Sequence, residues 1–93
     1  MRYKTSIVIL SYNTLQLLQL CIESIREHTE AGTYEIIVVE NASKDGSAAW
    51  LKEQSDLRCI CNEKNLGFPK GCNQGLAVAT GTELLLLNSD TVV

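Results

Sequence analysis

Three segments of this 93-residue chain are apolar at almost every position, not at every second one. They are 5–11 (TSIVILS), 34–39 (YEIIVV) and 83–87 (ELLLL). Such runs are typical of parallel strands in a sheet that is covered by helices on both faces, whereas a strand with one solvent face alternates. The chain is therefore expected to form an α/β structure around a buried, mainly parallel sheet.

An amphipathic helix is predicted after the first strand. Apolar side chains recur every three or four residues from Leu15 to Ile25, which is the spacing of one helix face. The helix is expected to end near Glu30, and Gly32 is expected to close it.

Two more strand–helix units follow. The segment 43–54 is predicted to be a loop that leads into a short helix, packed through Trp50 and Leu51. A strand is predicted over 57–61 (LRCIC), and a helix over 69–80, where a proline occupies the first turn.

Gly71 and Gly75 lie inside that last helix, where each glycine costs about 1 kcal/mol relative to alanine. A closely approaching backbone would account for both, and Gly81 is expected to stop the helix. The βαβαβαβ order with short loops predicts right-handed crossovers. The whole chain is expected to be one domain, a Rossmann-like, three-layer αβα half-domain around a mainly parallel four-stranded sheet.

Composition excludes several classes of function. The net charge of −3 comes without a basic stripe, which argues against nucleic-acid binding. The apolar run 84–87 is too short to span a bilayer, and the N-terminus does not have the pattern of a signal peptide, so the chain is expected in the cytosol. The four cysteines form no C-x-x-C pair and His28 has no partner at ligand spacing, so the cysteines are interpreted as small buried apolar residues.

Polar residues follow every predicted strand. In open α/β sheets ligands bind outside the carboxyl ends of the strands, so these residues predict a binding site there. A single residue such as Asn13 or Ser43 could instead cap the next helix, but capping explains four clusters on one edge less well. The four clusters are Ser11-Tyr12-Asn13, the segment 40–47 (ENASKDGS), the segment 62–67 (NEKNLG) and Asn88-Ser89-Asp90.

The residue types narrow the ligand. The segment 11–15 contains no glycine, which argues against a glycine-rich phosphate loop. Asp90 could hold a divalent metal that bridges phosphate oxygens, because Mg²⁺ sites use one or two carboxylates together with the phosphates of the substrate. Tyr12 offers a ring on which a base could stack, and Glu40 could accept hydrogen bonds from a base or a ribose.

Four segments carry a resemblance to a known family. They are 5–13 (TSIVILSYN), 36–47 (IIVVENASKDGS), 62–81 (NEKNLGFPKGCNQGLAVATG) and 84–93 (LLLLNSDTVV). In order and spacing the chain resembles the family 2 glycosyltransferases with the GT-A fold over essentially its whole length. The Asn-Leu-Gly-Phe and Asn-Ser-Asp segments are similar to those of rhamnosyltransferase-like members.

The resemblance implies a site for the nucleotide of a nucleotide-diphospho-sugar donor. Asp90 would hold Mn²⁺ or Mg²⁺, although Asn88 replaces the first acid of the family's Asp-x-Asp motif, and Glu40 stands where the family usually has aspartate. Asp45 belongs to the same acidic loop and could serve mainly to start the next helix. The residues implied to contact the nucleotide are Ser11, Tyr12, Asn13, Glu40, Asn41, Asn65, Gly67, Asn73, Asn88 and Ser89.

The resemblance also implies sugar transfer with inversion, which needs a general base for the acceptor hydroxyl. No residue before Val93 is a candidate, so the chain is interpreted as a donor half, truncated after the Asp-x-Asp-like motif. A glycan or lipid-linked acceptor would bind to the missing half, and a full-length parent is compatible with membrane association. The last strand would leave an apolar sheet edge exposed, which predicts self-association.

Three alternatives stay open. A sugar-phosphate nucleotidyltransferase would need a glycine-rich, basic loop where Ser11-Tyr12-Asn13 stands. A response-regulator-like module would need a phosphoacceptor aspartate at the end of the third strand, where the chain has Cys61-Asn62. The third alternative is a catalytically inactive fragment that keeps nucleotide affinity or only the fold.

Overall fold

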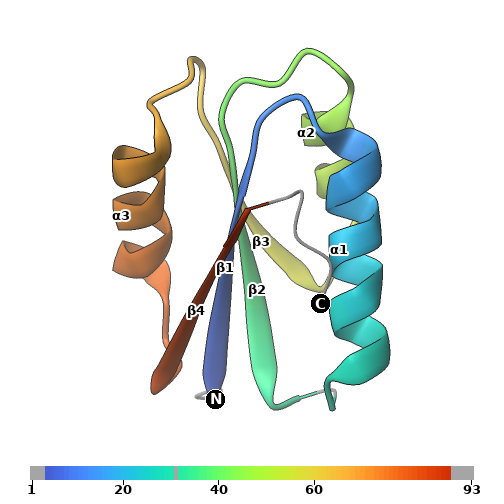
Figure 1. Ribbon diagram of the computed structural model, residues 1–93, viewed down its shortest axis with the longest axis vertical. Helices are drawn as coiled ribbons and strands as arrows, with labels where there is room; N and C mark the ends of the chain where they lie inside the picture. The colour runs from blue at the N-terminus through green and yellow to red at the C-terminus, as the bar shows by residue number, and fades with distance from the viewer. Residues whose placement is uncertain (1–3, 31, 89–93) are drawn as a thin grey trace.

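The computed structural model describes residues 4–30 and 32–88, which form a parallel sheet between two layers of helices. The strand order is β3-β2-β1-β4, and every neighbouring pair is parallel. Helices α1 and α2 cover one face and α3 covers the other (Figure 1). The predicted three-layer αβα arrangement around a parallel four-stranded sheet is confirmed. Its elements are β1 (Thr5–Ser11), α1 (Leu15–His28), β2 (Tyr34–Glu40), α2 (Ser47–Lys52), β3 (Leu57–Cys61), α3 (Phe68–Val78) and β4 (Glu83–Asn88).

Both faces of the central strands are buried, which is why their sequences do not alternate. On one face of β1, Ile7 and Ile9 pack in a cluster with α1 and with Leu51 of α2. On the other face, Val8 and Leu10 pack with α3. Each face therefore has its own apolar core. Among the described helices, none has the length and apolar content needed to cross a membrane.

Two helix ends differ from the sequence prediction. α1 ends at His28, because Thr29 is already extended, and Gly32 lies beyond it in the turn before β2 with φ of +90°. α3 ends at Val78. Gly81 therefore does not stop this helix directly: a Cβ at Gly81 would lie 2.7 Å from the backbone nitrogen of Ser6, so glycine is required for close contact with β1.

The glycines inside α3 allow close packing on β1, as the sequence suggested. The groups that approach them are side chains of the strand and not a second backbone. A Cβ added at Gly71 would lie 2.5 Å from Cδ2 of Leu10. A Cβ at Gly75 would meet Val8, whose Cγ2 and Cβ atoms would be 3.2 and 3.3 Å away.

The cysteines are all free thiols, and only part of the prediction for them is correct. Cys21 and Cys72 are buried in the two cores, whereas Cys59 is half-buried and Cys61 is exposed. The difference follows from topology, because both less buried residues lie on β3, an edge strand. Burial, with a smaller contribution from the neighbouring Cys61, raises the pKa of Cys59 to about 11.

A buried carboxylate joins the layers at the amino edge of the sheet. Glu35 on β2 is 7% exposed and accepts hydrogen bonds from the Ser6 hydroxyl (2.6 Å) and from the backbone N–H and hydroxyl of Thr80 (2.7 and 2.8 Å). Arg58 on β3 lies 3.5 Å from it, and the N–H of Gly81 donates to the Ser6 hydroxyl at 2.7 Å. The turn from α3 to β4 is thereby fixed to the sheet.

Candidate functional site

The carboxyl ends of the strands lie together at one edge of the sheet. Ser11 at the end of β1 is in register with Glu40 at the end of β2, which in turn is in register with Cys61 of β3. On the other side, Asn88 of β4 pairs with Leu10 of β1. The four polar clusters of the sequence therefore follow strands that end at one edge.

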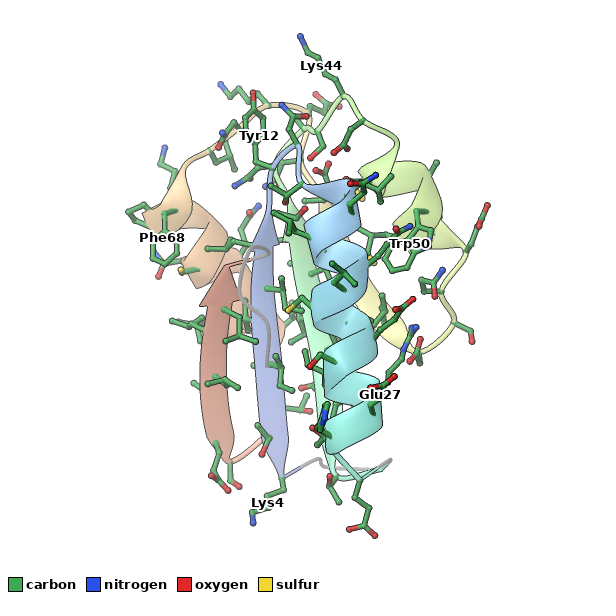
Figure 2. All side chains as sticks on the ribbon, turned by 45° about the vertical axis from the view of Figure 1, so that its right-hand side comes forward. Lys4, Tyr12, Glu27, Lys44, Trp50 and Phe68 are labelled. Atoms are coloured by element: carbon green, nitrogen blue, oxygen red, sulfur yellow. The ribbon has the colours of Figure 1, made fainter. Side chains whose placement is uncertain are left out.

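Aromatic and basic side chains stand above this edge. Figure 2 shows Tyr12 and Lys44 rising from the loops beyond the strand ends, and Phe68 directed outward from the start of α3. Tyr12 is 47% exposed, and Phe68 is 54% exposed. The ring of Tyr12 is therefore accessible to a planar ligand.

Hydrogen bonds join the loops after β1 and β2. The backbone N–H of Asn13 donates to the Ser43 hydroxyl at 2.7 Å, and the Asn13 side-chain oxygen accepts the N–H of Lys44 at 2.7 Å. Asn13 has a left-handed backbone with φ of 51°, a conformation that asparagine tolerates better than most residues. Asn13 and Ser43 thus bind each other's loops and do not cap their own helices.

Asp45 extends this connection to both helices of the same layer. Its carboxylate accepts the N–H of Leu15 at the start of α1 (2.9 Å) and the N–H and hydroxyl of Ser47 at the start of α2 (3.1 and 2.6 Å). The Ser47 hydroxyl, followed by these backbone bonds, keeps the pKa of Asp45 below its ordinary value although burial opposes the shift. The expected helix-starting role of Asp45 is confirmed, for two helices.

Glu40 is turned into the protein. It is 1% exposed, and both of its carboxylate oxygens accept the backbone N–H of Ser43, at 3.0 and 3.1 Å. The carboxylate therefore shapes the loop that carries Asn41. Ala42 in this loop has φ of 64°, a strained value for a residue with a Cβ.

Three side-chain amides connect β2, β3 and α3 below the edge. Asn62, directly after β3, donates through Nδ2 to the side-chain oxygens of Asn41 and Gln74, both at 2.8 Å. Gln74 of α3 in turn donates a hydrogen bond from Nε2 to the Asn62 side-chain oxygen at 2.9 Å. Asn41 itself is buried, with 5% exposure.

The remaining predicted residues are more dispersed. Asn65 accepts the N–H of Gly67 at 2.8 Å, and Gly67 has φ of 85°, so both residues shape the loop that leads into α3. Asn73 is exposed in the middle of α3. Asn88 closes β4, whereas Ser89 and Asp90 lie outside the described residues.

Ser11 is an exception to the hydrogen bonding of this edge. It is 2% exposed, and its hydroxyl oxygen is the one buried side-chain polar atom in 4–30 and 32–88 for which these residues provide no partner. A buried hydroxyl without a partner costs about 1–3 kcal/mol, so it favours a ligand or another part of the chain nearby.

The same edge contains two open hollows. One has a volume of about 410 Å³ beside Asn13, Leu15 and Asp45. The other, about 570 Å³, is lined by residues that follow β3, including Asn62 and Lys64. Both volumes are in the 300–1,000 Å³ range of small-ligand sites. Across residues 4–30 and 32–88, no three His, Cys, Asp or Glu side chains gather in a way that could hold a metal ion.

Sequence reasoning missed Asn62 and Gln74 as part of this site. Asn62 belongs to the polar segment 62–67 but was not predicted to contact the ligand, and Gln74 lies in the predicted helix 69–80 without a predicted role. The available signal was the position of an amide directly after a strand, at the edge where ligands bind.

Comparisons with known proteins agree with this geometry. The model of the family described as "Glycosyl transferase family 2" matches residues 6–93. The glycosyltransferase GlyG of Streptococcus pneumoniae serotype 4 is 32% identical over 92 residues, which are 95% of this chain and 30% of the relative. The chain thus spans less than a third of this relative's length.

Solved structures show the same fold. The chain of S. aureus TarS 1–349 in complex with UDP has a TM-score of 0.84 and 25% identity, over 94% of this chain and 27% of that chain. The mannosyltransferase PcManGT from Pyrobaculum calidifontis, in complex with GDP-Man and Mn²⁺, has a TM-score of 0.84 and 23% identity, over 99% of this chain and 29% of that protein.

Proposed function

Because this chain belongs to glycosyl transferase family 2, we propose that it provides the donor-nucleotide site of an enzyme that transfers a sugar from a nucleotide-diphospho-sugar. The observation that carries the proposal is the arrangement of the carboxyl edge. Polar segments follow four parallel strands there, and two of the loops are fixed to each other through Asn13 and Ser43. The acceptor would be a glycan or a lipid-linked sugar, and the subgroup would be the rhamnosyltransferase-like one.

Each part of the edge has a role in this proposal. The exposed ring of Tyr12 stacks on the base, and Asn41 hydrogen-bonds the nucleotide. The Ser11 hydroxyl, which lacks a partner among the described residues, supports a ligand close to the end of β1. Glu40 shapes the loop that carries Asn41 through the N–H of Ser43, and its remaining lone pairs can accept from the base or the ribose.

A divalent cation, Mn²⁺ or Mg²⁺, is part of this proposal. Asn88 ends β4 and pairs with Leu10 of β1 at the carboxyl edge, and Asp90, which lies outside the described residues, follows it by two positions in the sequence. A single carboxylate with substrate phosphates is a normal donor set for these hard cations. When bound, the cation would neutralise charge on the diphosphate leaving group.

We place the general base of the inverting reaction outside the described residues. The Glu40 carboxylate is buried against Ser43, and Asp45 is occupied by Leu15 and Ser47. Neither carboxylate is placed to receive a proton from an acceptor hydroxyl. The chain alone is therefore expected to bind the donor nucleotide without transferring the sugar.

The proposal is tested by calorimetric titration of the chain with UDP, GDP and dTDP, each with and without Mn²⁺. We expect one of the three nucleotides to bind, with an affinity that increases when the metal is present. No binding of any nucleotide under either condition would overturn the proposed function and leave only the fold.

We also propose that the chain associates with itself through β4. This strand is at the edge of the sheet, and Leu84, Leu85 and Leu86 are 54, 43 and 43% exposed. Exposed apolar side chains next to unpaired backbone groups favour edge-to-edge pairing. Analytical ultracentrifugation is expected to show dimers or larger species, and Leu85→Lys is expected to shift them toward the monomer. A wild-type chain that sediments as a single monomer at all concentrations would contradict this proposal.

A further inference from the structure

The side chain of Asn62 is fixed from two directions. Both hydrogens of its amide are used, one by the Asn41 oxygen and one by the Gln74 oxygen, and its own oxygen accepts from Gln74. Its backbone N–H donates to the carbonyl of Glu40 at 2.9 Å, which ties residue 62 to the end of β2. Asn62 therefore has little freedom to turn.

This arrangement fixes the direction of the neighbouring amide of Asn41. The Asn41 oxygen faces Asn62, so its nitrogen, Nδ2, faces away from Asn62 and toward the first turn of α3. A Cβ added at Gly71 would lie 3.4 Å from this nitrogen. The hydrogen bond to Asn62 uses the Asn41 oxygen and leaves Nδ2 out, and an amide nitrogen can only donate.

We propose that Asn62 is a positioning residue, which holds the Asn41 amide so that its nitrogen donates to an oxygen atom of the bound nucleotide. The inference rests on the proposed function and adds to it the direction of one hydrogen bond, in which the protein donates and the nucleotide accepts. The ligand atom must be an acceptor, which means a base carbonyl, a ribose oxygen or a phosphate oxygen. A donor such as a base amino group would face Nδ2, which is also a donor, and no hydrogen bond could form.

Asn62→Asp tests the proposal with almost no change in shape. At neutral pH an aspartate cannot donate, so Asn41 must turn and donate its own nitrogen to residue 62. The Asn41 oxygen would then face the nucleotide oxygen, and both would be acceptors. We expect the affinity for the nucleotide that binds in the titration above to fall by about tenfold or more, which is the scale of an unsatisfied buried polar contact.

Cys61→Asp is the matched control. It adds one negative charge at the exposed side chain next to residue 62, so it reproduces a repulsion of the diphosphate from this position. It leaves the three hydrogen bonds among Asn41, Asn62 and Gln74 in place. We expect the affinity of this variant to stay within about threefold of the wild type. An equal loss in both variants would overturn the inference, because it would indicate charge or general damage.

A second readout separates positioning from structural support. In an Asn41→Ala background, Asn62→Asp should cause no further loss of affinity, because the group on which it acts is gone. A loss as large as in the wild-type background would overturn the inference. Should Asn62→Asp fail to fold by circular dichroism, Asn41→Asp provides the same change of donor to acceptor while keeping the bond from Asn62, and the same loss is expected.

Titration of the matching nucleoside identifies the atom that is recognised. A loss of affinity for both nucleoside and nucleotide assigns the acceptor to the base or ribose, and a loss for the nucleotide alone assigns it to a phosphate. Unchanged affinity of Asn62→Asp or Asn41→Asp for a nucleotide that the wild type binds overturns the inference and leaves the proposed function intact. Absence of binding by the wild type overturns both.

Discussion

Replacement of Glu35 by alanine is expected to lower the free energy of unfolding by about 3–5 kcal/mol, the scale for breaking a buried charged network. The carboxylate receives three hydrogen bonds of 2.6 to 2.8 Å from Ser6 and Thr80. Its removal leaves these donors without an acceptor in the space between α3 and the sheet. Because small domains have a total stability of about 5–15 kcal/mol, the effect should be visible in any urea titration.

Glu23→Ala is the control for this change. Glu23 is an exposed residue of α1, and its replacement is expected to alter stability by no more than about 0.5 kcal/mol. An effect of Glu35→Ala as small as that of this control would show that the Glu35 carboxylate does not hold the amino edge together.

The same carboxylate should make the chain sensitive to acid. Burial raises the pKa of Glu35, but hydrogen bonds from Ser6, Thr80 and Arg58 outweigh it and bring the pKa below the ordinary 4.5. As the pH falls, the Glu35 carboxylate is therefore protonated at a higher pH in the unfolded chain than in the folded chain. The stabilisation from Glu35 is complete above its pKa in the unfolded chain, and it is lost as the pH falls through its pKa in the folded chain. Urea titrations at several pH values below 5 should show a shallower pH dependence in Glu35→Gln than in the wild type.

Gly75→Ala is expected to destabilise the chain by about 1–3 kcal/mol, the usual cost of overpacking a core. Helix propensity alone predicts the opposite, a gain of about 1 kcal/mol. The added methyl group would press on Val8, a β-branched side chain with a single favoured rotamer and no room to move in the core. Urea unfolding of the variant provides the measurement.

Two further variants check the cause. Gly71→Ala should cost less, because the atom it meets is the end of the Leu10 side chain, which can rotate. In the double variant Val8→Ala with Gly75→Ala, the free energy of unfolding should fall by less than the sum of the two single losses. The reason is that the smaller side chain at residue 8 makes room for the added methyl group at residue 75. A stability gain for Gly75→Ala alone would show that α3 does not lie as close to β1 as described.

The sheet could be predicted because its signal is local. The strands predicted at 5–11 and 57–61 became β1 and β3 with the expected bounds. For β1 the reason is that a buried parallel strand is apolar at almost every position. Helix ends were less predictable. α1 ends at His28, two residues before the expected position, because the turn that places Gly32 depends on where β2 begins.

The position of the polar segments at the carboxyl edge was also predictable, because these segments follow the strands in sequence. The partners of each side chain were not. The sequence does not indicate that Glu40 accepts the N–H of Ser43, or that Asp45 accepts the N–H of Leu15, thirty residues earlier in the chain. Contacts of this kind arise only when separate loops meet, so neither composition nor spacing reveals them. Glu35 is a similar case, since its donors come from β1 and from the turn after α3.

The most direct test of the donor-site account is the metal dependence of nucleotide binding in Asp90→Ala. Calorimetry with the nucleotide that binds the wild type, in the presence and absence of Mn²⁺, compares this variant with Asp56→Ala, in which the lost carboxylate pairs with Arg26 far from the site. We expect the Mn²⁺-dependent part of the affinity, roughly 10- to 100-fold, to disappear in Asp90→Ala and to persist in Asp56→Ala. An Asp90→Ala variant that binds nucleotide with the full Mn²⁺ enhancement would contradict the account.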